Sequence, residues 1–282
     1  ADIHVGSPRS FRFAPAWNQN WQTAKEQMVP LQPDFLLVGG DLARDGNIHA
    51  FEMEAVKAEL DALPFLCHVI PGNMDTGNKH TEVSGPRRND VNLNITSESL
   101  QNFRDTFGPL WWSFDQKGVR FSAFCDILVG SGLPEEKGLW AWLDEQAERD
   151  AADHHVWMTH YPLFIEHPEE PNWDIGDPDH YHDWYFSIDR PWRDRLLEVF
   201  RRTGTDLVLS GHVHCRKRHE FDGITFLIGP STAFPQWGDR WTDGDATLGF
   251  MSVEVGEELL RPRFVPLACV SDEKGYGPGG HP

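Results

Sequence analysis

The stretch LVLSGHVH, residues 207–214, joins a short apolar run to two histidines that are separated by one residue. A run of this length, followed by a glycine, is typical of a strand that is covered on both faces of a sheet. Because alternate residues of an extended segment face the same side, His212 and His214 point in the same direction. The stretch therefore predicts a buried strand with two histidines at its carboxyl end.

Potential metal ligands follow other predicted strands in the same way. Apolar runs predict these strands at residues 35–38, 65–70, 119–129 and 156–159, the third run being long enough for two strands. Asp41 follows the first run, Asn73 follows the second and His160 follows the last. Asp2 and His4 repeat the spacing of the two histidines. Ligands of α/β sheets bind outside the carboxyl ends of the strands, so we expect these side chains to converge on one site.

Helical patterns alternate with the predicted strands, which favours a layered α/β (α+β) fold around a central sheet. The helical patterns cover residues 18–28, 48–63, 98–107, 139–152 and 191–203. Residues 223–228, 247–255 and 259–265 alternate between apolar and polar and predict antiparallel strands, so that the sheet is mixed or split in two. We expect one domain over residues 1–270, with lid-like insertions at 76–96 and 167–188 and a flexible tail at 271–282. Plain surface loops are the alternative for both insertions.

Composition limits the classes of protein to which the chain can belong. The 282 residues carry 25 Lys and Arg against 44 Asp and Glu, a formal net charge of −19. This charge repels phosphate backbones and anionic membranes, so long nucleic acids are not expected as partners. No apolar run approaches the ~18 residues of a membrane span. The 4 Cys are far apart and form no CxxC motif, which favours reduced core thiols, whereas the 14 His invite a search for metal ligands.

The ordered set DxH, GD, GNxD, H and GHxH, with a strand before nearly every member, resembles the calcineurin-like metallophosphoesterases. The resemblance extends from Asp2 to about Val255 and includes the segment FGPLWWSFDQKGVRFSAF. The chain is most similar to the bacterial cyclic-nucleotide-phosphodiesterase-like and purple-acid-phosphatase-like branches. The fold that this resemblance implies is a two-sheet β-sandwich flanked by helices, with a dimetal site at the carboxyl ends of the strands.

The resemblance also implies two metal ions and the residues that hold them. The first metal is assigned Asp2, His4 and His214, the second Asn73, His160 and His212, and Asp41 bridges both. The implied catalytic residues are Asp41, Asn73, His160 and Asp75, the last of them orienting a ligand. Nitrogen and oxygen ligands suit Mn, Fe, Zn or Ni, and we expect Mn or Fe. Such a pair of metals generates a bridging hydroxide that attacks phosphorus in line with the leaving oxygen.

One departure from the family pattern affects the expected substrate. The usual motif is GNHD or GNHE, whereas this chain has GNMD, with Met74 in place of the histidine. A thioether cannot donate a proton to a leaving group. We therefore expect a phosphodiesterase that acts on a small nucleotide-like or other soluble diester, ahead of a phosphomonoesterase. Alternatively, His80, His180 or His182 substitutes for the missing histidine, unless each is an ordinary surface residue.

Several tryptophans lie in predicted loops that the resemblance brings near the metals. They are Trp173, Trp184, Trp237 and Trp241. These side chains are candidates for stacking on a nucleobase or another flat group, with pinning of the loops as the alternative. Two further functions stay open: a non-catalytic metal-binding or interaction module of the same fold, and dimetal chemistry other than phosphoester hydrolysis. The acidic surface disfavours a DNA nuclease.

The first ligand motif stands at the start of the sequence, where Ala1 directly precedes Asp2. By the resemblance, this motif follows a buried strand, so we expect further residues upstream. We also expect a cytoplasmic location, although the expected upstream residues leave a signal peptide open.

Overall fold

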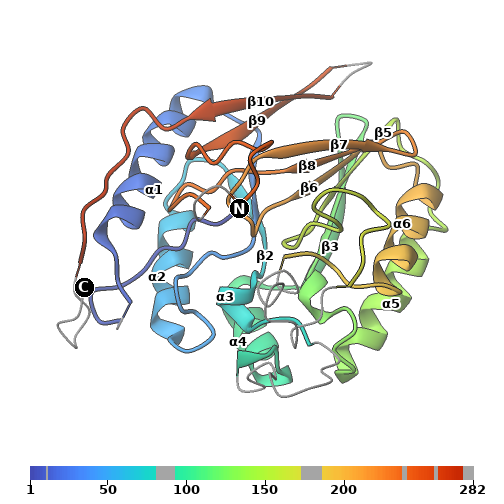
Figure 1. Ribbon diagram of the computed structural model, residues 1–282, viewed down its shortest axis with the longest axis horizontal. Coiled ribbons are helices and arrows are strands. Elements are labelled where there is room, and N and C mark those ends of the chain that lie inside the picture. The colour runs from blue at the N-terminus through green and yellow to red at the C-terminus, as the bar shows by residue number, and fades with distance from the viewer. Residues whose placement is uncertain (11, 81–92, 173–185, 237–239, 257–259, 276–282) are drawn as a thin grey trace.

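The computed structural model describes residues 1–10, 12–80, 93–172, 186–236, 240–256 and 260–275. Its largest sheet has six strands in the order β3-β4-β5-β6-β8-β7 (Figure 1). These strands are β3 (Trp111–Gln116), β4 (Val119–Phe124), β5 (His154–Met158), β6 (Leu207–Ser210), β7 (Lys217–Phe221) and β8 (Ile224–Ile228). The neighbours from β4 to β8 are parallel, whereas β3 and β7 pair antiparallel at the two edges. The sheet is therefore mixed, as the sequence predicts.

Two strand pairs lie against one face of this sheet. The parallel pair consists of β1 (Phe35–Gly39) and β2 (Leu66–Ile70), and the antiparallel pair consists of β9 (Gly249–Val255) and β10 (Leu260–Pro266). Phe35 and Met251 of these pairs pack against a buried cluster that includes Val156 and Leu207 of the central sheet. Non-polar side chains thus fill the space between the layers, as in a sandwich of two sheets.

Helices cover the outer faces of the layers, which confirms the predicted α/β architecture. They are α1 (Pro15–Met28), α2 (Ala50–Asp61), α4 (Ser97–Phe107), α5 (Pro134–Gln146) and α6 (Trp192–Arg202), with the short α3 (Asn73–Thr76) and the 3₁₀ turns η1 (Val29–Leu31) and η3 (Asp126–Leu128). In Figure 1, α1 and α2 lie on one side of the strands and α5 and α6 on the other. The main buried cluster includes Trp21, Met53, Phe103, Trp157 and Phe200, so both helical layers contribute to the core.

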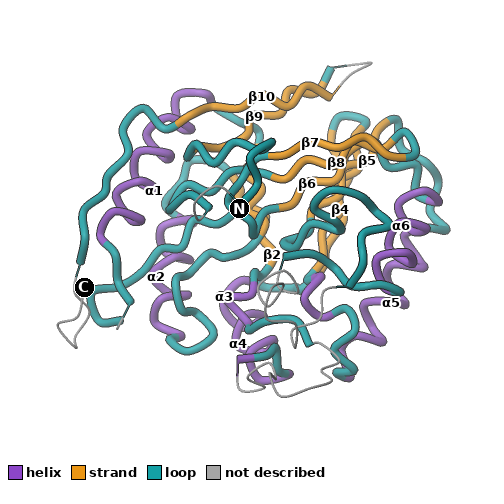
Figure 2. The backbone as a smooth tube through the Cα atoms, in the orientation of Figure 1, coloured by secondary structure: helices purple, strands orange, loops and turns teal. Residues whose placement is uncertain are grey.

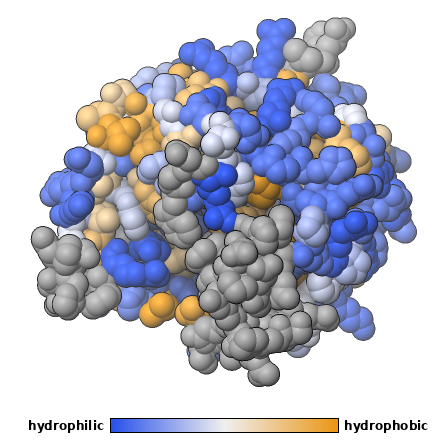
Figure 3. All heavy atoms as spheres, viewed as in Figure 1, coloured by the Kyte–Doolittle hydropathy of each residue, from blue (hydrophilic) through white to orange (hydrophobic). Residues whose placement is uncertain are grey.

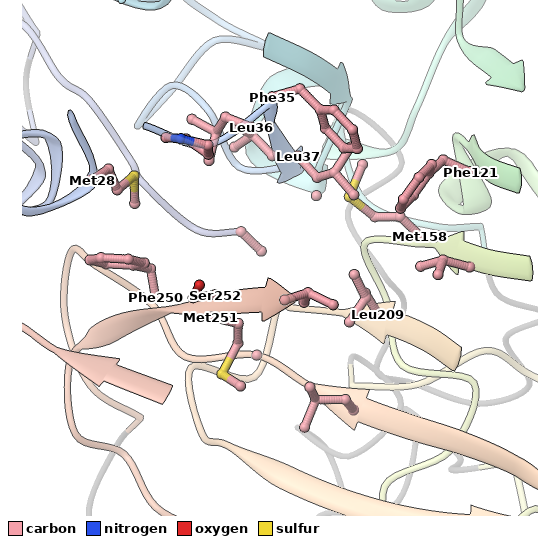
Figure 4. Close-up of a pocket in the computed structure, with 18 of the residues that line it drawn as sticks. Met28, Phe35, Leu36, Leu37, Phe121, Met158, Leu209, Phe250, Met251 and Ser252 are labelled. Carbon is pink, nitrogen blue, oxygen red and sulfur yellow. The ribbon is translucent and has the colours of Figure 1, made fainter. Parts of the chain in front are cut away.

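A cavity of about 540 Å³ lies between β1 and β9, on the side that faces the central sheet. Phe35, Leu37, Phe121, Phe250 and Met251 point into it (Figure 4). The lining contains none of the predicted metal ligands. The cavity is therefore distinct from the site described below.

The structure differs from the sequence-based expectations at several elements. The sequence pattern does not predict β3 and β7, and α5 ends at Gln146 instead of residue 152. The prediction of two strands over residues 119–129 is wrong in its second half, because a single strand ends at Phe124 and the turn η3 follows. The predicted flexible tail, residues 271–282, is described only to residue 275. In this part, the N–H of Ser271 donates to Asn20 Oδ1, and the carbonyl of Glu273 accepts from the N–H of Ala16, both in α1. All 4 cysteines are free thiols.

The visible surface is mostly polar, and the described helices are short or polar, in agreement with the composition of the sequence. The face shown in Figure 3 is predominantly hydrophilic. None of the helices in the described part of the chain is both long and apolar enough to cross a membrane. Loops surround the N-terminus, which lies near the middle of the view in Figure 2, beside the strands. These loops carry the predicted ligands.

Candidate metal centre

The first ligand motif is held beside the loop that follows β1. The backbone N–H of Asp2 donates to the carbonyl of Gly40 (3.0 Å), and the N–H of His4 donates to the carbonyl of Asp41 (3.0 Å). The N–H of His212, from the loop after β6, donates to the Asp2 carboxylate (2.9 Å). Backbone bonds thus bring three loops from distant parts of the sequence to one point.

Two groups of potential ligands meet there. The first group is Asp2, His4, Asp41 and His214, and the second is Asp41, His160 and His212. All of these side chains are buried, and the ligand atoms within each group lie within 4.8 Å of one another. The Nε2 atoms of His4 and His214 are 3.1 Å apart, and His212 Nδ1 is 3.2 Å from His160 Nε2. Within the described residues, the structure therefore brings together every histidine of the predicted ligand set.

Asp41 is the one residue shared by both groups. Its Oδ2 is 3.6 Å from His4 Nε2, and its Oδ1 is 3.4 Å from His160 Nε2. The backbone N–H of Met74 donates to Oδ1 (2.8 Å), which fixes the orientation of the carboxylate. The two carboxylate oxygens thus face different histidine groups.

Asn73 completes the second group from the start of α3. Its Oδ1 is 3.0 Å from His160 Nε2, and its Nδ2 donates to Asn78 Oδ1 (3.1 Å). Because an amide nitrogen can only donate and Asn78 offers an acceptor, this bond turns the Asn73 oxygen toward the histidines.

Backbone carbonyls set the tautomers of two histidines. His160 Nδ1 lies 2.9 Å from the carbonyl oxygen of Gly39, and His214 Nδ1 lies 2.8 Å from that of Phe234. A carbonyl oxygen only accepts, so each Nδ1 carries a proton and each Nε2 presents a lone pair to the centre. This arrangement is typical of histidines that bind metals.

The backbone at the centre is strained. Asp2, His4, Asp41, His212 and His214 all have positive φ angles, of 61°, 45°, 49°, 70° and 50°. A residue with a side chain gains nothing locally from this conformation, which costs roughly 1–3 kcal/mol per residue. The surrounding structure therefore offsets this cost to aim these side chains at one point, as is common at functional sites.

Two buried carboxylates hold the loops in place. Asp75 accepts from the backbone N–H groups of Leu42 (3.1 Å), Ala43 (2.9 Å) and Gly72 (2.8 Å), and so ties the Asp41 loop to the Asn73 loop. Asp126 accepts from the N–H groups of His160 (2.6 Å) and Tyr161 (2.8 Å). The sequence motifs indicate Asp75 but not Asp126, although Asp126 also follows a strand.

The electrostatics of the centre favour bound cations. Burial and the neighbouring Asp2 carboxylate raise the pKa of Asp41 to about 8, and burial together with Asp41 raises the pKa of Asp75 to about 7. Burial also lowers the pKa of His4 well below its usual value. A histidine whose charged form is disfavoured and several buried carboxylates leave a site that is short of positive charge, and metal ions would supply it. The donor set therefore fits two metal ions that prefer nitrogen and oxygen ligands.

The remaining predicted residues have varied positions. Met74 lies beside the centre, with its Sδ 3.5 Å from Asn73 Nδ2. His80 is half-buried, and its Nε2 lies 2.9 Å from the carbonyl of Ile95. Trp241 packs edge-on against Phe186. His180, His182, Trp173, Trp184 and Trp237 lie outside the described residues.

The curated proteins that the chain resembles are named as phosphatases. The chain is 24% identical over 298 aligned residues to the serine/threonine-protein phosphatase CPPED1 of Danio rerio, and the match covers 96% of this chain and 84% of that protein. It is 27% identical over 215 residues to CPPED1 of Homo sapiens, covering 70% of this chain and 58% of that protein. The chain thus spans less than two thirds of the human relative.

Solved structures share the fold at low sequence identity. A purple acid phosphatase, PPD1 from yellow lupin (Lupinus luteus) seeds, superposes with a TM-score of 0.61 at 14% identity, covering 94% of this chain and 49% of that chain. GAP50, described as the anchor in the inner membrane complex of Plasmodium, gives a TM-score of 0.56 at 14% identity, covering 97% and 87%. The model of the calcineurin-like phosphoesterase family matches residues 1–216. This chain therefore belongs to the calcineurin-like phosphoesterase family.

Proposed function

We propose that this chain holds two metal ions and hydrolyses phosphate esters between them. The observation that carries the proposal is the position of Asp41, whose Oδ1 faces His160 and whose Oδ2 faces His4. A carboxylate with a nitrogen ligand beside each oxygen is suited to bridge two cations. When bound, such a pair of metals lowers the pKa of a bound water and neutralises charge on phosphoryl oxygens.

The protein contributes a preorganised set of donors. We propose Asp2, His4 and His214 as ligands of one metal, and Asn73, His160 and His212 as ligands of the other. Carbonyl acceptors behind His160 and His214 fix their lone pairs toward the centre. Asp75 and Asp126 keep the ligand loops in position through backbone bonds, so little reorganisation is needed when the metals bind.

The choice between diester and monoester substrates is still a prediction. The preference for a small diester depends on Met74, which cannot donate a proton to a leaving group. The curated relatives are named serine/threonine-protein phosphatases, and a protein phosphoserine is a monoester. A non-catalytic interaction module is the alternative, and GAP50, which is described as an anchor, shares this fold.

Hydrolysis of an aryl phosphodiester and the matching aryl phosphomonoester tests the proposal. The purified chain is assayed on both, with added Mn²⁺ and with chelator, beside an Asp41→Asn variant that controls for contaminating phosphatases. We expect turnover of at least one ester by the Mn²⁺-loaded wild type, and loss of turnover in chelator and in Asp41→Asn. A folded wild type that retains its metals and hydrolyses neither ester would overturn the proposal in favour of the interaction module.

A further inference from the structure

An aromatic wall extends outward from the first group of ligands. The Phe234 ring lies 4.3 Å from that of His214 and 5.0 Å from that of His4, between centroids. On its other side, Phe234 contacts Trp17 at 4.6 Å with an interplanar angle of 32°. Both aromatic side chains are half-buried, so the wall begins at the ligands and reaches the surface.

Arg44 continues this wall to the second group of ligands. Its guanidinium lies 4.9 Å from the centre of the Trp17 ring, and its Nη1 is 3.8 Å from Met74 Sδ. Met74 in turn contacts Asn73. A half-buried cation therefore connects Trp17 of the aromatic wall with the methionine that replaces the usual histidine of the family motif.

Arg44 pairs with a neighbouring carboxylate, and its positive charge also affects Asp41. Arg44 Nη1 is 3.7 Å from Asp45 Oδ1, and the same carboxylate accepts two bonds from Arg12. Arg44 also opposes the rise in the pKa of Asp41 that burial and Asp2 cause. Because Arg44 contacts Met74 and Met74 contacts Asn73, the guanidinium lies one side chain away from a proposed ligand and can attract an anion that binds at the centre.

We propose that Arg44 binds a terminal oxygen of the substrate phosphoryl group and thereby selects phosphate monoesters over diesters. This inference rests on the proposed function. Two metal ions and one guanidinium offer three cationic partners. A monoester dianion presents three terminal oxygens to them, whereas a diester presents two and carries one charge fewer. Arginine suits this role because it is always charged and donates from a planar fork to phosphate oxygens.

The same geometry explains why Arg44 is stacked. A free arginine side chain loses rotamer freedom when it binds an anion. The Trp17 ring holds the guanidinium in place before substrate arrives, and a cation over a tryptophan face is itself favourable. Trp17 is therefore a positioning residue, and Arg44 is the residue that touches the substrate.

The test uses three variants of the full chain. Arg44→Gln removes the charge, and Arg44→Lys keeps the charge without the planar fork. Arg195→Gln is the matched control, because Arg195 on α6 stacks over Trp140 on α5 (3.8 Å), away from the ligand loops. For each Mn²⁺-loaded protein we measure kcat/KM on the aryl monoester and diester, the Kd of inorganic phosphate by calorimetry, and the melting temperature.

We expect Arg44→Gln to lower monoester kcat/KM and phosphate affinity by roughly 10- to 100-fold, the usual effect of losing a hydrogen bond to a charged group. Diester turnover should change much less, Arg44→Lys should recover part of the loss, and Arg195→Gln should resemble the wild type. Equal losses on both esters with unchanged phosphate affinity would show a structural role and overturn the inference, as would a wild type that prefers the diester. If the wild type hydrolyses neither ester, the proposed function fails first and the inference fails with it.

Discussion

Gly40→Ala adds a methyl group at a crowded point of the ligand loops. Gly40 has a φ of +89°, and a Cβ there would lie 2.6 Å from His160 Nδ1 and 2.7 Å from the backbone N and Cα of Gly72. His160 Nδ1 also donates to the carbonyl of Gly39, so the imidazole cannot move without losing that bond. The substitution therefore combines backbone strain with a collision against two ligand loops.

The magnitude is the sum of two costs. A side chain in the left-handed region costs about 1–2 kcal/mol, and overpacking a filled interior costs typically about 1–3 kcal/mol. We expect Gly40→Ala to lose roughly 2–5 kcal/mol of unfolding free energy on these grounds. Gly223→Ala is the matched control, because Gly223 has a similar φ of +79° and a methyl group there would meet nothing within 4 Å.

Equilibrium urea unfolding in chelator measures both variants without the contribution of bound metal. Gly223→Ala should lose only the backbone cost, about 1–2 kcal/mol. Gly40→Ala should lose at least ~1 kcal/mol more, and should also bind less metal than the control when Mn²⁺ is restored. Equal losses in the two variants, with equal metal content, would refute the claim that Gly40 is required for close approach of the ligand loops.

Two further predictions follow from buried polar contacts. Asn78→Ala should lower metal affinity about 10- to 100-fold, because Asn73 loses the acceptor that orients its amide. Asn78→Asp keeps an acceptor and should bind metal as the wild type does. Equal metal affinities of Asn78→Ala and the wild type, measured by competition with a chelating dye, would contradict this role. Burial lowers the pKa of His155 to about 4, with the Thr203 carbonyl opposing the shift, so its neutral form stabilises the fold fully above pH ~6.5 and this contribution is lost as the pH falls toward 4. Urea unfolding at pH 7 and pH 4.5 should show a loss of up to about 3 kcal/mol that His155→Gln lacks, and identical pH profiles would show that the imidazole is not held neutral.

The convergence of these side chains could be predicted from the sequence because Asp41, Asn73, His160, His212 and His214 follow recognisable strands. Leu207–Ser210 is observed with the predicted bounds, because a short apolar run between polar segments favours a buried strand. The glycines before Asp41 and His212 mark the turns that the loops need. Local pattern and tertiary role coincide at these positions.

Other features depend on contacts between distant residues. The second half of the run 119–129 is apolar enough for a strand, yet it forms η3 because the Asp126 carboxylate accepts from two backbone groups of the His160 loop. The edge strand β7 has the sequence KRHEF, which lacks an apolar pattern and is held by pairing with β8. Such elements follow from tertiary pairing more than from local propensity.

The aromatic wall beside the metal centre could not be predicted from the sequence either, because it too depends on contacts between distant residues. Trp17 belongs to a helix, Arg44 to a turn and Phe234 to a loop, and none of them stands in a recognisable motif. Only the fold brings them together beside the ligands. A search of the sequence for basic residues next to ligand motifs would have selected Arg44 without indicating its partner.

The central claim is that Asp41 bridges two metal ions, and metal content per chain tests it most directly. Wild type and Asp41→Ala are stripped of metal with chelator, reloaded with Mn²⁺ and freed of excess metal. Their metal content is measured by inductively coupled plasma mass spectrometry, and circular dichroism establishes that both are folded. We predict two metal ions per wild-type chain and almost none in Asp41→Ala, since both sites lose a ligand at once. A folded Asp41→Ala protein that still retains two metal ions per chain would contradict the account.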